Sequence, residues 1–135
     1  MVEPRSSDAA FDRHLRSLLP PDGTGVVNCT APAWCAPCRR LHPTIEELRG
    51  QHARIKFLVL DMDDAEAAAQ GEPFGVTGLP TTLVAHEGTV LERIVGADAA
   101  ALRRAVAKLD ENISKGASQI ALPYAAQASL GTPKE

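Results

Sequence analysis

The sequence predicts an α/β protein in which a central mixed β-sheet is flanked by helices on both faces. Segments with helical spacing of apolar residues alternate with short apolar runs typical of strands, in the order α, β, α, β, α, β, β, α. The chain has 135 residues, which fits one domain, and 44% of them are hydrophobic, which is enough for a core. Neither an internal repeat nor a long linker divides it.

A first helix is expected over residues 9–19, where apolar residues recur at i, i+4 and i+7 from Phe11 through Leu15 to Leu18. Ser7 or Asp8 can cap its start, and two prolines followed by Asp-Gly end it. Residues 25–29 then form a short apolar strand.

A loop with two prolines leads into a second helix, which starts near Cys35 or Cys38 and ends near Gly50. Its apolar face carries Leu41, Ile45 and Leu48. Pro43 lies inside this helix and should kink it, because proline removes one backbone donor.

The second half of the chain predicts three strands and a short helix. Residues 55–60 are nearly all apolar, as in a strand covered on both faces. Residues 64–70 form an alanine-rich helix. Residues 81–85 and 89–95 read as a hairpin around Glu87-Gly88.

A last helix begins after its capping residue, Asp98, and its core-facing positions are Leu102, Val106, Leu109 and Ile113. We expect the domain to span residues 1–113. Residues 114–135 have no strong period and contain two glycines and two prolines, which predicts a mobile tail. The alternative is a short extra helix docked on the body.

Charge and composition exclude several classes of function. The net charge of −3 makes nucleic acid and anionic membrane surfaces poor partners, and no apolar run is long enough to span a bilayer. The first seven residues lack a following apolar segment, as a secretory signal would have, and nearby acidic residues argue against a transit peptide. We therefore expect a cytoplasmic protein in a reducing compartment.

The clearest indication of a chemical function is the stretch Trp34-Cys35-Ala36-Pro37-Cys38-Arg39. Two cysteines separated by two residues are typical of a dithiol/disulfide exchange site. With Cys29, the chain has three cysteines within ten residues, which in a reducing compartment indicates catalysis or metal binding. A zinc half-site made with Cys29 and His42 is the metal alternative.

The chain resembles the thioredoxin family over roughly residues 8–113. The matching features are Trp34-Cys35-Ala36-Pro37-Cys38, Pro43 five residues after the second cysteine, Asp61-Met62-Asp63, Val76-Thr77-Gly78-Leu79-Pro80-Thr81 and Val95-Gly96-Ala97. Ala36 stands where the family usually has glycine. The resemblance implies the thioredoxin fold and a thiol–disulfide oxidoreductase, and it argues against zinc because Pro80 occupies the space a metal needs.

By this resemblance, Cys35 lies at a helix N-terminus, where unpaired N–H groups and the helix dipole stabilise its thiolate. Cys35 attacks a substrate disulfide, and Cys38 resolves the mixed disulfide. Pro37 stiffens the loop, and Arg39 supplies a nearby cation that stabilises the thiolate or orients acidic partners.

The resemblance also implies the surroundings of the pair. Trp34 contacts substrate, and Pro80 is cis and packs against the cysteines. The backbone of Thr77, Gly78 and Leu79 pairs with an extended substrate segment. Gly96 either allows close backbone approach at this groove or forms an ordinary turn.

The chain departs from the family at a buried acid that normally lies under the cysteine pair. That position is Asn28 or Cys29, depending on the alignment, and we favour Asn28. The lysine that accompanies the acid is replaced by Val59, so both buried charges are lost together. Slower or more pH-dependent turnover would follow. Cys29 is either an inert buried thiol, which we favour, or a third redox thiol.

Taken together, these features predict a monomeric enzyme that reduces protein disulfides, with no cofactor beyond the Cys35–Cys38 disulfide and no metal. A thioredoxin reductase using NADPH, or another dithiol, would recharge it, since the chain has no nucleotide-binding fingerprint. The alternative is a binding module that grips a partner through the same groove, and the tail after Ser114 is the feature that favours it.

Overall fold

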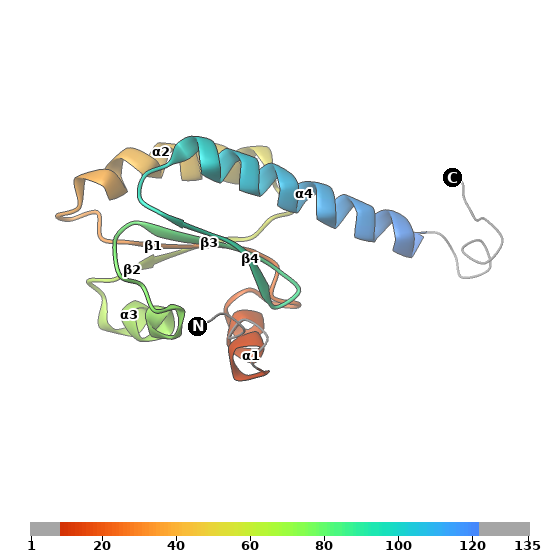
Figure 1. The fold of residues 1–135 in the computed structure, drawn as a ribbon, viewed down its shortest axis with the longest axis horizontal. Helices are drawn as coiled ribbons and strands as arrows, with labels where there is room; N and C mark the ends of the chain where they lie inside the picture. Colours follow the sequence, from red (N-terminus) through yellow and green to blue (C-terminus); the bar gives the residue numbers. More distant parts are fainter. Residues whose placement is uncertain (1–8, 122–135) are drawn as a thin grey trace.

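The computed structural model describes residues 9–121, with side chains described for residues 9–116. A central sheet carries α2 and α4 on one face and α1 and α3 on the other (Figure 1). The elements are α1 (Ala9–Leu18), β1 (Gly25–Thr30), α2 (Ala36–Gln51), β2 (Phe57–Asp61), α3 (Ala65–Gly71), the 3-10 turn η2 (Glu72–Phe74), β3 (Thr81–His86), β4 (Thr89–Val95) and α4 (Ala99–Ala121). The predicted element order and the predicted α/β class are confirmed.

The sheet has four strands in the order β2-β1-β3-β4. β1 pairs parallel with β2 and antiparallel with β3, and β4 pairs antiparallel with β3, so the sheet is mixed as predicted. Glu87 and Gly88 both have positive φ (52° and 83°), which is the backbone that a tight hairpin turn requires. The central strand β1 is buried along its whole length.

Two apolar layers fill the space between sheet and helices. On one face Val26 and Val84 pack with Leu41, Ile45 and Leu48 of α2 and Leu102, Val106 and Leu109 of α4. On the other face Val27 and Leu83 pack with Phe11 and Leu15 of α1 and with Phe74. β2 contributes alternate residues to both layers, which confirms that this apolar run is covered on both faces.

Several boundaries differ from the prediction. α1 ends at Leu18, and Leu19 rather than Leu18 is fully buried, because the chain turns into the core before the Pro20-Pro21 pair. By contrast, α2 runs from Ala36 through Pro43 to Gln51, as predicted from a start near Cys35 and an end near Gly50. The predicted cap of α1 by Ser7 or Asp8 lies outside the described residues.

The largest difference is at α4. Asp98 caps it as predicted, with the Ala101 N–H donating to the Asp98 carboxylate at 3.0 Å. The helix does not end at Ile113, where we placed the domain boundary, but continues to Ala121. One glycine in this stretch lowers helix stability without ending the helix, and the next proline comes only at position 123. Residues 122–135 of the predicted tail lie outside the described residues.

Within the described residues, no helix combines the length and the apolar character needed to cross a membrane.

Candidate active site

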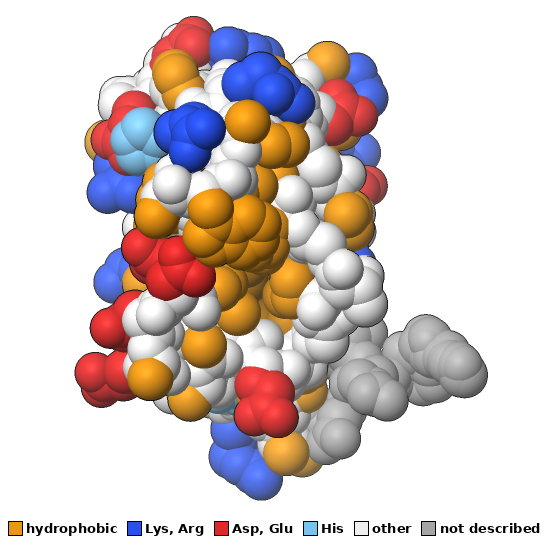
Figure 2. Space-filling model, turned by 90° about the vertical axis from the view of Figure 1, so that its left-hand side faces the viewer, with side chains coloured by type: hydrophobic (Ala, Val, Ile, Leu, Met, Phe, Trp, Pro, Cys, Tyr) orange, Lys and Arg blue, Asp and Glu red, His pale blue; other side chains and the backbone are white. Residues whose placement is uncertain are grey.

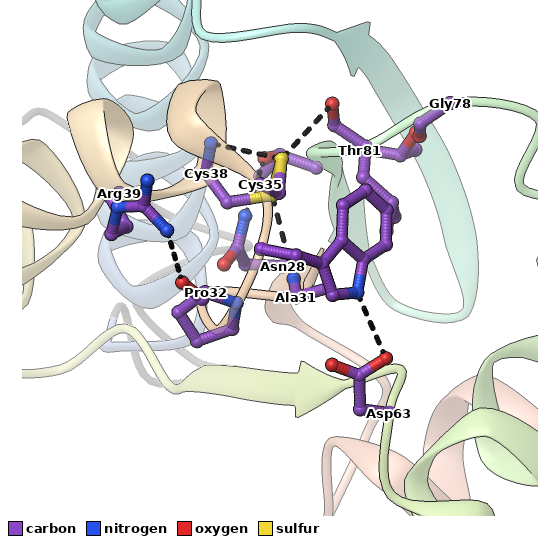
Figure 3. The surroundings of a disulfide bond; sticks show 12 residues. Asn28, Ala31, Pro32, Cys35, Cys38, Arg39, Asp63, Gly78 and Thr81 are labelled. Carbon is purple, nitrogen blue, oxygen red and sulfur yellow. Dashed lines mark hydrogen bonds between the residues drawn. A yellow bond between two sulfur atoms is a disulfide. The ribbon is translucent and has the colours of Figure 1, made fainter.

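Cys35 and Cys38 form a disulfide at the start of α2, with their Cα atoms 5.2 Å apart (Figure 3). Cys35 is the N-cap residue of this helix, and its Sγ accepts the Cys38 N–H at 3.2 Å. Cys35 is 5% exposed and Cys38 2% exposed, so the pair lies just below the surface. Cys35, whose sulfur caps the helix, is therefore slightly more exposed than Cys38.

The first turn of α2 is electrostatically suited to a thiolate. It contains no acidic residue, and Pro37 lies within it, where a missing N–H costs nothing. The Ala31 N–H donates to Cys38 Sγ at 3.4 Å, so each sulfur accepts one backbone donor. Because N–H groups and the helix dipole both favour negative charge, this position stabilises Cys35 as a thiolate once the disulfide opens.

The loop before β3 lies against the disulfide. The Leu79–Pro80 peptide is cis, as the resemblance implies, and the Leu79 carbonyl oxygen lies 3.7 Å from Cys35 Sγ. Thr81 Oγ1 donates to the Gly78 carbonyl at 2.5 Å, which ties the loop to the first residue of β3. The structure thus brings Gly78, Leu79 and Pro80 to the cysteine pair, and Thr77 is an exposed neighbour of this loop.

Gly96 joins the same region through its backbone, because its N–H donates to the Pro80 carbonyl at 2.7 Å. Its φ is +100°, and a Cβ added there would meet no atom within 4 Å. The glycine is therefore needed for its backbone conformation rather than for close packing.

Trp34 is 63% exposed beside the disulfide, and its indole N–H donates to Asp63 Oδ1 at 3.1 Å. Asp63 in turn donates its backbone N–H to Asp61 Oδ1 at 3.0 Å, which is the strand-end turn predicted from the sequence. The bond between Asp63 and Trp34 was not predicted. The only available signal was that Asp63 follows a strand parallel to β1, so that both strands end at the same edge.

The surface around the pair is largely apolar. Val95 is 56% exposed and lies beside Gly78. A Cβ built on Gly78 would be 3.5 Å from Val95 Cγ1. Figure 2 shows hydrophobic side chains gathered at the centre of this end of the molecule, with acidic and basic side chains around them. Such a surface suits contact with another protein.

Arg39 does not pair with the cysteine sulfurs in this state. Its Nη1 donates to the Pro32 carbonyl at 2.7 Å, and its backbone N–H donates to the Cys35 carbonyl. The guanidinium thus holds the loop that precedes the disulfide. Ala36 occupies the first helical position of α2, next to the N-cap.

Asn28 and Cys29 face opposite sides of the sheet. Asn28 is buried among the residues that surround the disulfide (Figure 3), and its Nδ2 donates to Thr82 Oγ1 at 3.0 Å. Its register partner on β2 is Val59. Among the described residues no Asp, Glu, Lys or Arg side chain is buried, so the layer beneath the cysteine pair is polar but uncharged.

Cys29 lies in the layer beneath α1 and α3, away from the disulfide. A Cβ added at Gly71 would lie 3.6 Å from Cys29 Sγ, which places this thiol against α3. Burial raises the pKa of the Cys29 thiol to about 11, and Arg93 opposes the shift only partly.

The residues of the zinc alternative do not converge. Cys29 faces the other side of the sheet, and His42 is exposed on α2, where its nearest acidic partner is Glu46 at 4.0 Å. The described part of the chain holds no group of three His, Cys, Asp or Glu side chains arranged to bind a metal.

Comparisons with known proteins agree with this geometry. The family model for thioredoxin matches residues 3–108. Thioredoxin H2 of Arabidopsis thaliana is 33% identical over 77% of this chain and 76% of that protein. Thioredoxin-1 of Saccharomyces cerevisiae is 35% identical over 79% of this chain and 97% of that protein. The crystal structure of oxidized thioredoxin O2 from Arabidopsis thaliana superposes with a TM-score of 0.64 at 28% identity, covering 75% of this chain and 87% of that one.

Proposed function

The chain belongs to the thioredoxin family, and from this premise we propose that it reduces disulfides of protein substrates in the cytoplasm, with Cys35 as the nucleophile. It is a thiol–disulfide oxidoreductase whose redox dithiol is the Cys35–Cys38 pair. The observation that carries the proposal is the position of Cys35, which caps α2 beside the cis-Pro80 loop.

The reaction passes two electrons in two exchange steps. The Cys35 thiolate attacks a substrate disulfide, forms a Cys35–substrate disulfide and releases one substrate thiolate. The Cys38 thiolate then attacks Cys35 Sγ, which re-forms the Cys35–Cys38 disulfide and releases the second substrate thiolate. Protons from solvent neutralise the released thiolates. Cys38 is almost fully buried, which supports its role as the resolving thiol.

Substrate binds along the loop that faces the disulfide. The backbone of Thr77, Gly78 and Leu79 pairs with an extended segment of the substrate, and cis-Pro80 keeps that segment beside Cys35. Trp34 and Gly96 border the same groove. The exposed apolar side chains of Trp34 and Val95 support this assignment, because they offer contact area on either side of the loop.

The oxidised protein must regain two electrons before the next cycle. A thioredoxin reductase or another dithiol donor supplies them by the same exchange chemistry. We propose that the protein works as a monomer and that its only redox group is the cysteine pair.

A binding module with secondary redox activity is the second candidate. The observation that favours it is the continuation of α4 to Ala121, eight residues beyond Ile113. Deletion of residues 114–135 separates the two functions, because exchange chemistry would survive and a partner held by the tail would be lost.

The test is reduction of insulin disulfides by the protein with dithiothreitol, beside Cys35→Ser. Turnover above the dithiothreitol background that the substitution abolishes is the expected result. If the wild-type protein does not accelerate the reaction although Cys35 and Cys38 titrate as free thiols, reduction of general protein disulfides is not its function.

A further inference from the structure

An open groove of about 450 Å³ runs between the edge strand β4 and helix α4. We call it the β4–α4 groove, and the lining residues used below are Leu91, Glu92, Ala101, Arg104, Ala105 and Lys108. None of them takes part in the exchange chemistry. Its lining combines apolar residues with two cations, one carboxylate (Glu92) and one amide (Asn112).

A β-bulge places Leu91 in this groove. Val84 pairs with Glu92 and Ala85 pairs with Val90, so Leu91 is an extra residue without a partner on β3. Leu91 is 41% exposed, although it is a large apolar side chain. Because a bulge interrupts the regular ladder, a partner strand cannot continue in register along this edge. An occupant must therefore bind through its side chains.

The cations of the groove are available to a ligand. Arg104 and Lys108 lie one turn apart on α4, and both are exposed. Their helix neighbour Arg103 is paired with Glu47, and Lys115 with Glu111. Within the described part of the chain, Arg104 and Lys108 form no ion pair, not even with Glu92 of the same groove.

We propose that the β4–α4 groove docks an acidic segment of a partner protein, in which an aliphatic side chain lies between carboxylates. The aliphatic side chain packs on Leu91, Ala101 and Ala105, and the carboxylates meet Arg104 and Lys108. The groove carries two cations against the single carboxylate of Glu92, and this balance favours an acidic occupant.

The groove is also suitably placed to present a substrate. β4 continues from Leu91 to Val95, about 13 Å along the strand, and the next residue, Gly96, bonds to the Pro80 carbonyl. A partner held in the groove can thus bring a disulfide to Cys35. This last step rests on the proposed function, whereas binding in the groove does not.

The test is an NMR titration of the oxidised full-length ¹⁵N-labelled chain with the acetylated and amidated heptapeptide GEELEEG at low ionic strength. We expect amide shifts centred on Leu91, Arg104 and Lys108. The peptides GEESEEG and GKKLKKG, which lack the aliphatic side chain or reverse the charge, should bind at least fivefold more weakly.

Two matched variants locate the binding site. Lys108→Glu should weaken binding of GEELEEG about fivefold, whereas Lys115→Glu, on the same helix but outside the groove, should change it less than twofold. Equal weakening by both variants, binding of GKKLKKG as tight as that of GEELEEG, or no binding of GEELEEG overturns the proposal. Insulin reduction measures the proposed function separately, and both variants should retain it.

Discussion

Cys29 and Cys35 are six residues apart in the chain, and the fold gives them opposite chemistry. Cys29 lies inside β1, fully buried in the layer beneath α1 and α3, and burial raises the pKa of its thiol to about 11. Cys35 lies where β1 has ended and α2 begins, and its sulfur accepts a backbone N–H. The two cysteines show that backbone position, rather than residue type, sets the surroundings of each thiol and how readily it should ionise.

The largest expected difference in turnover is between variants of Cys38, the proposed resolving thiol, and variants of Cys29. Cys38→Ser should reduce insulin turnover to background and accumulate a covalent complex between Cys35 and the substrate, because no second thiol releases it. Cys29→Ser should keep turnover within about twofold. Mass spectrometry of the trapped complex under non-reducing conditions checks the first result. A trapped complex attached to Cys29 would contradict the comparison.

In the reduced protein, Cys35 and Cys29 should also differ in their rates of alkylation. With a pKa of about 11, roughly one Cys29 in 10⁴ is a thiolate at pH 7, so iodoacetamide should modify Cys35 at least about 100-fold faster. The pKa is raised, so the Cys29 rate should climb with pH throughout the range from 7 to 10. In guanidinium chloride, where burial is lost, all three cysteines should react alike, and peptide mapping at timed intervals measures each rate.

Asn28→Asp tests the uncharged layer beneath the cysteine pair. The new carboxyl would be buried opposite Val59 without a cation, so its folded pKa would rise above the unfolded value of about 3.9. We expect a loss of about 3 kcal/mol in unfolding free energy at pH 7, which disappears as the pH falls below about 4. Urea unfolding at pH 7 and pH 4 checks this.

The same variant tests whether the missing acid slows catalysis. A carboxylate beneath the pair can accept the Cys38 proton only while it is ionised, so turnover should rise at pH values above the raised pKa of this carboxyl and change little below it. An unchanged rate across the pH range would show that turnover of this chain does not depend on an internal base.

The smallest effect should come from Asp63→Ala, which removes the acceptor of the Trp34 indole N–H. The bond is exposed and contributes about 1 kcal/mol or less to holding the indole. We expect a two- to fivefold drop in kcat/KM for insulin with little change in stability. Trp34 is the only tryptophan, so a shift in fluorescence would report its release directly. Glu66→Ala, an exposed position three residues further along the chain, is the control for loss of a surface carboxylate.

Local chemistry predicted much of this molecule from the sequence. The spacing of Cys35 and Cys38 predicted a dithiol site, Asp98 predicted a helix cap, and Glu87-Gly88 predicted a hairpin turn. Each of these three features depends on a few neighbouring residues, so it could be predicted without the tertiary structure. The role of Cys35 as nucleophile stays a prediction.

Features that depend on distant residues could not be predicted in this way. The bond from Trp34 to Asp63 joins positions 29 residues apart, and the Leu91 bulge depends on the register between two strands. The continuation of α4 past Ile113 was missed because residues 114–135 have no strong apolar period and contain two glycines and two prolines, although one glycine does not end a helix. In the first two cases the deciding contact lies outside the local pattern.

The disulfide closes a loop with only two residues between the cysteines. In the chain-entropy view, so short a crosslink removes few conformations from the unfolded chain and contributes only about 2 kcal/mol of stability, less than a crosslink across a long segment. The apolar layers on the two faces of the sheet therefore hold the fold largely without it. Reduction of the bond should therefore leave the protein folded, so that the cysteine pair can carry electrons through repeated cycles on one scaffold.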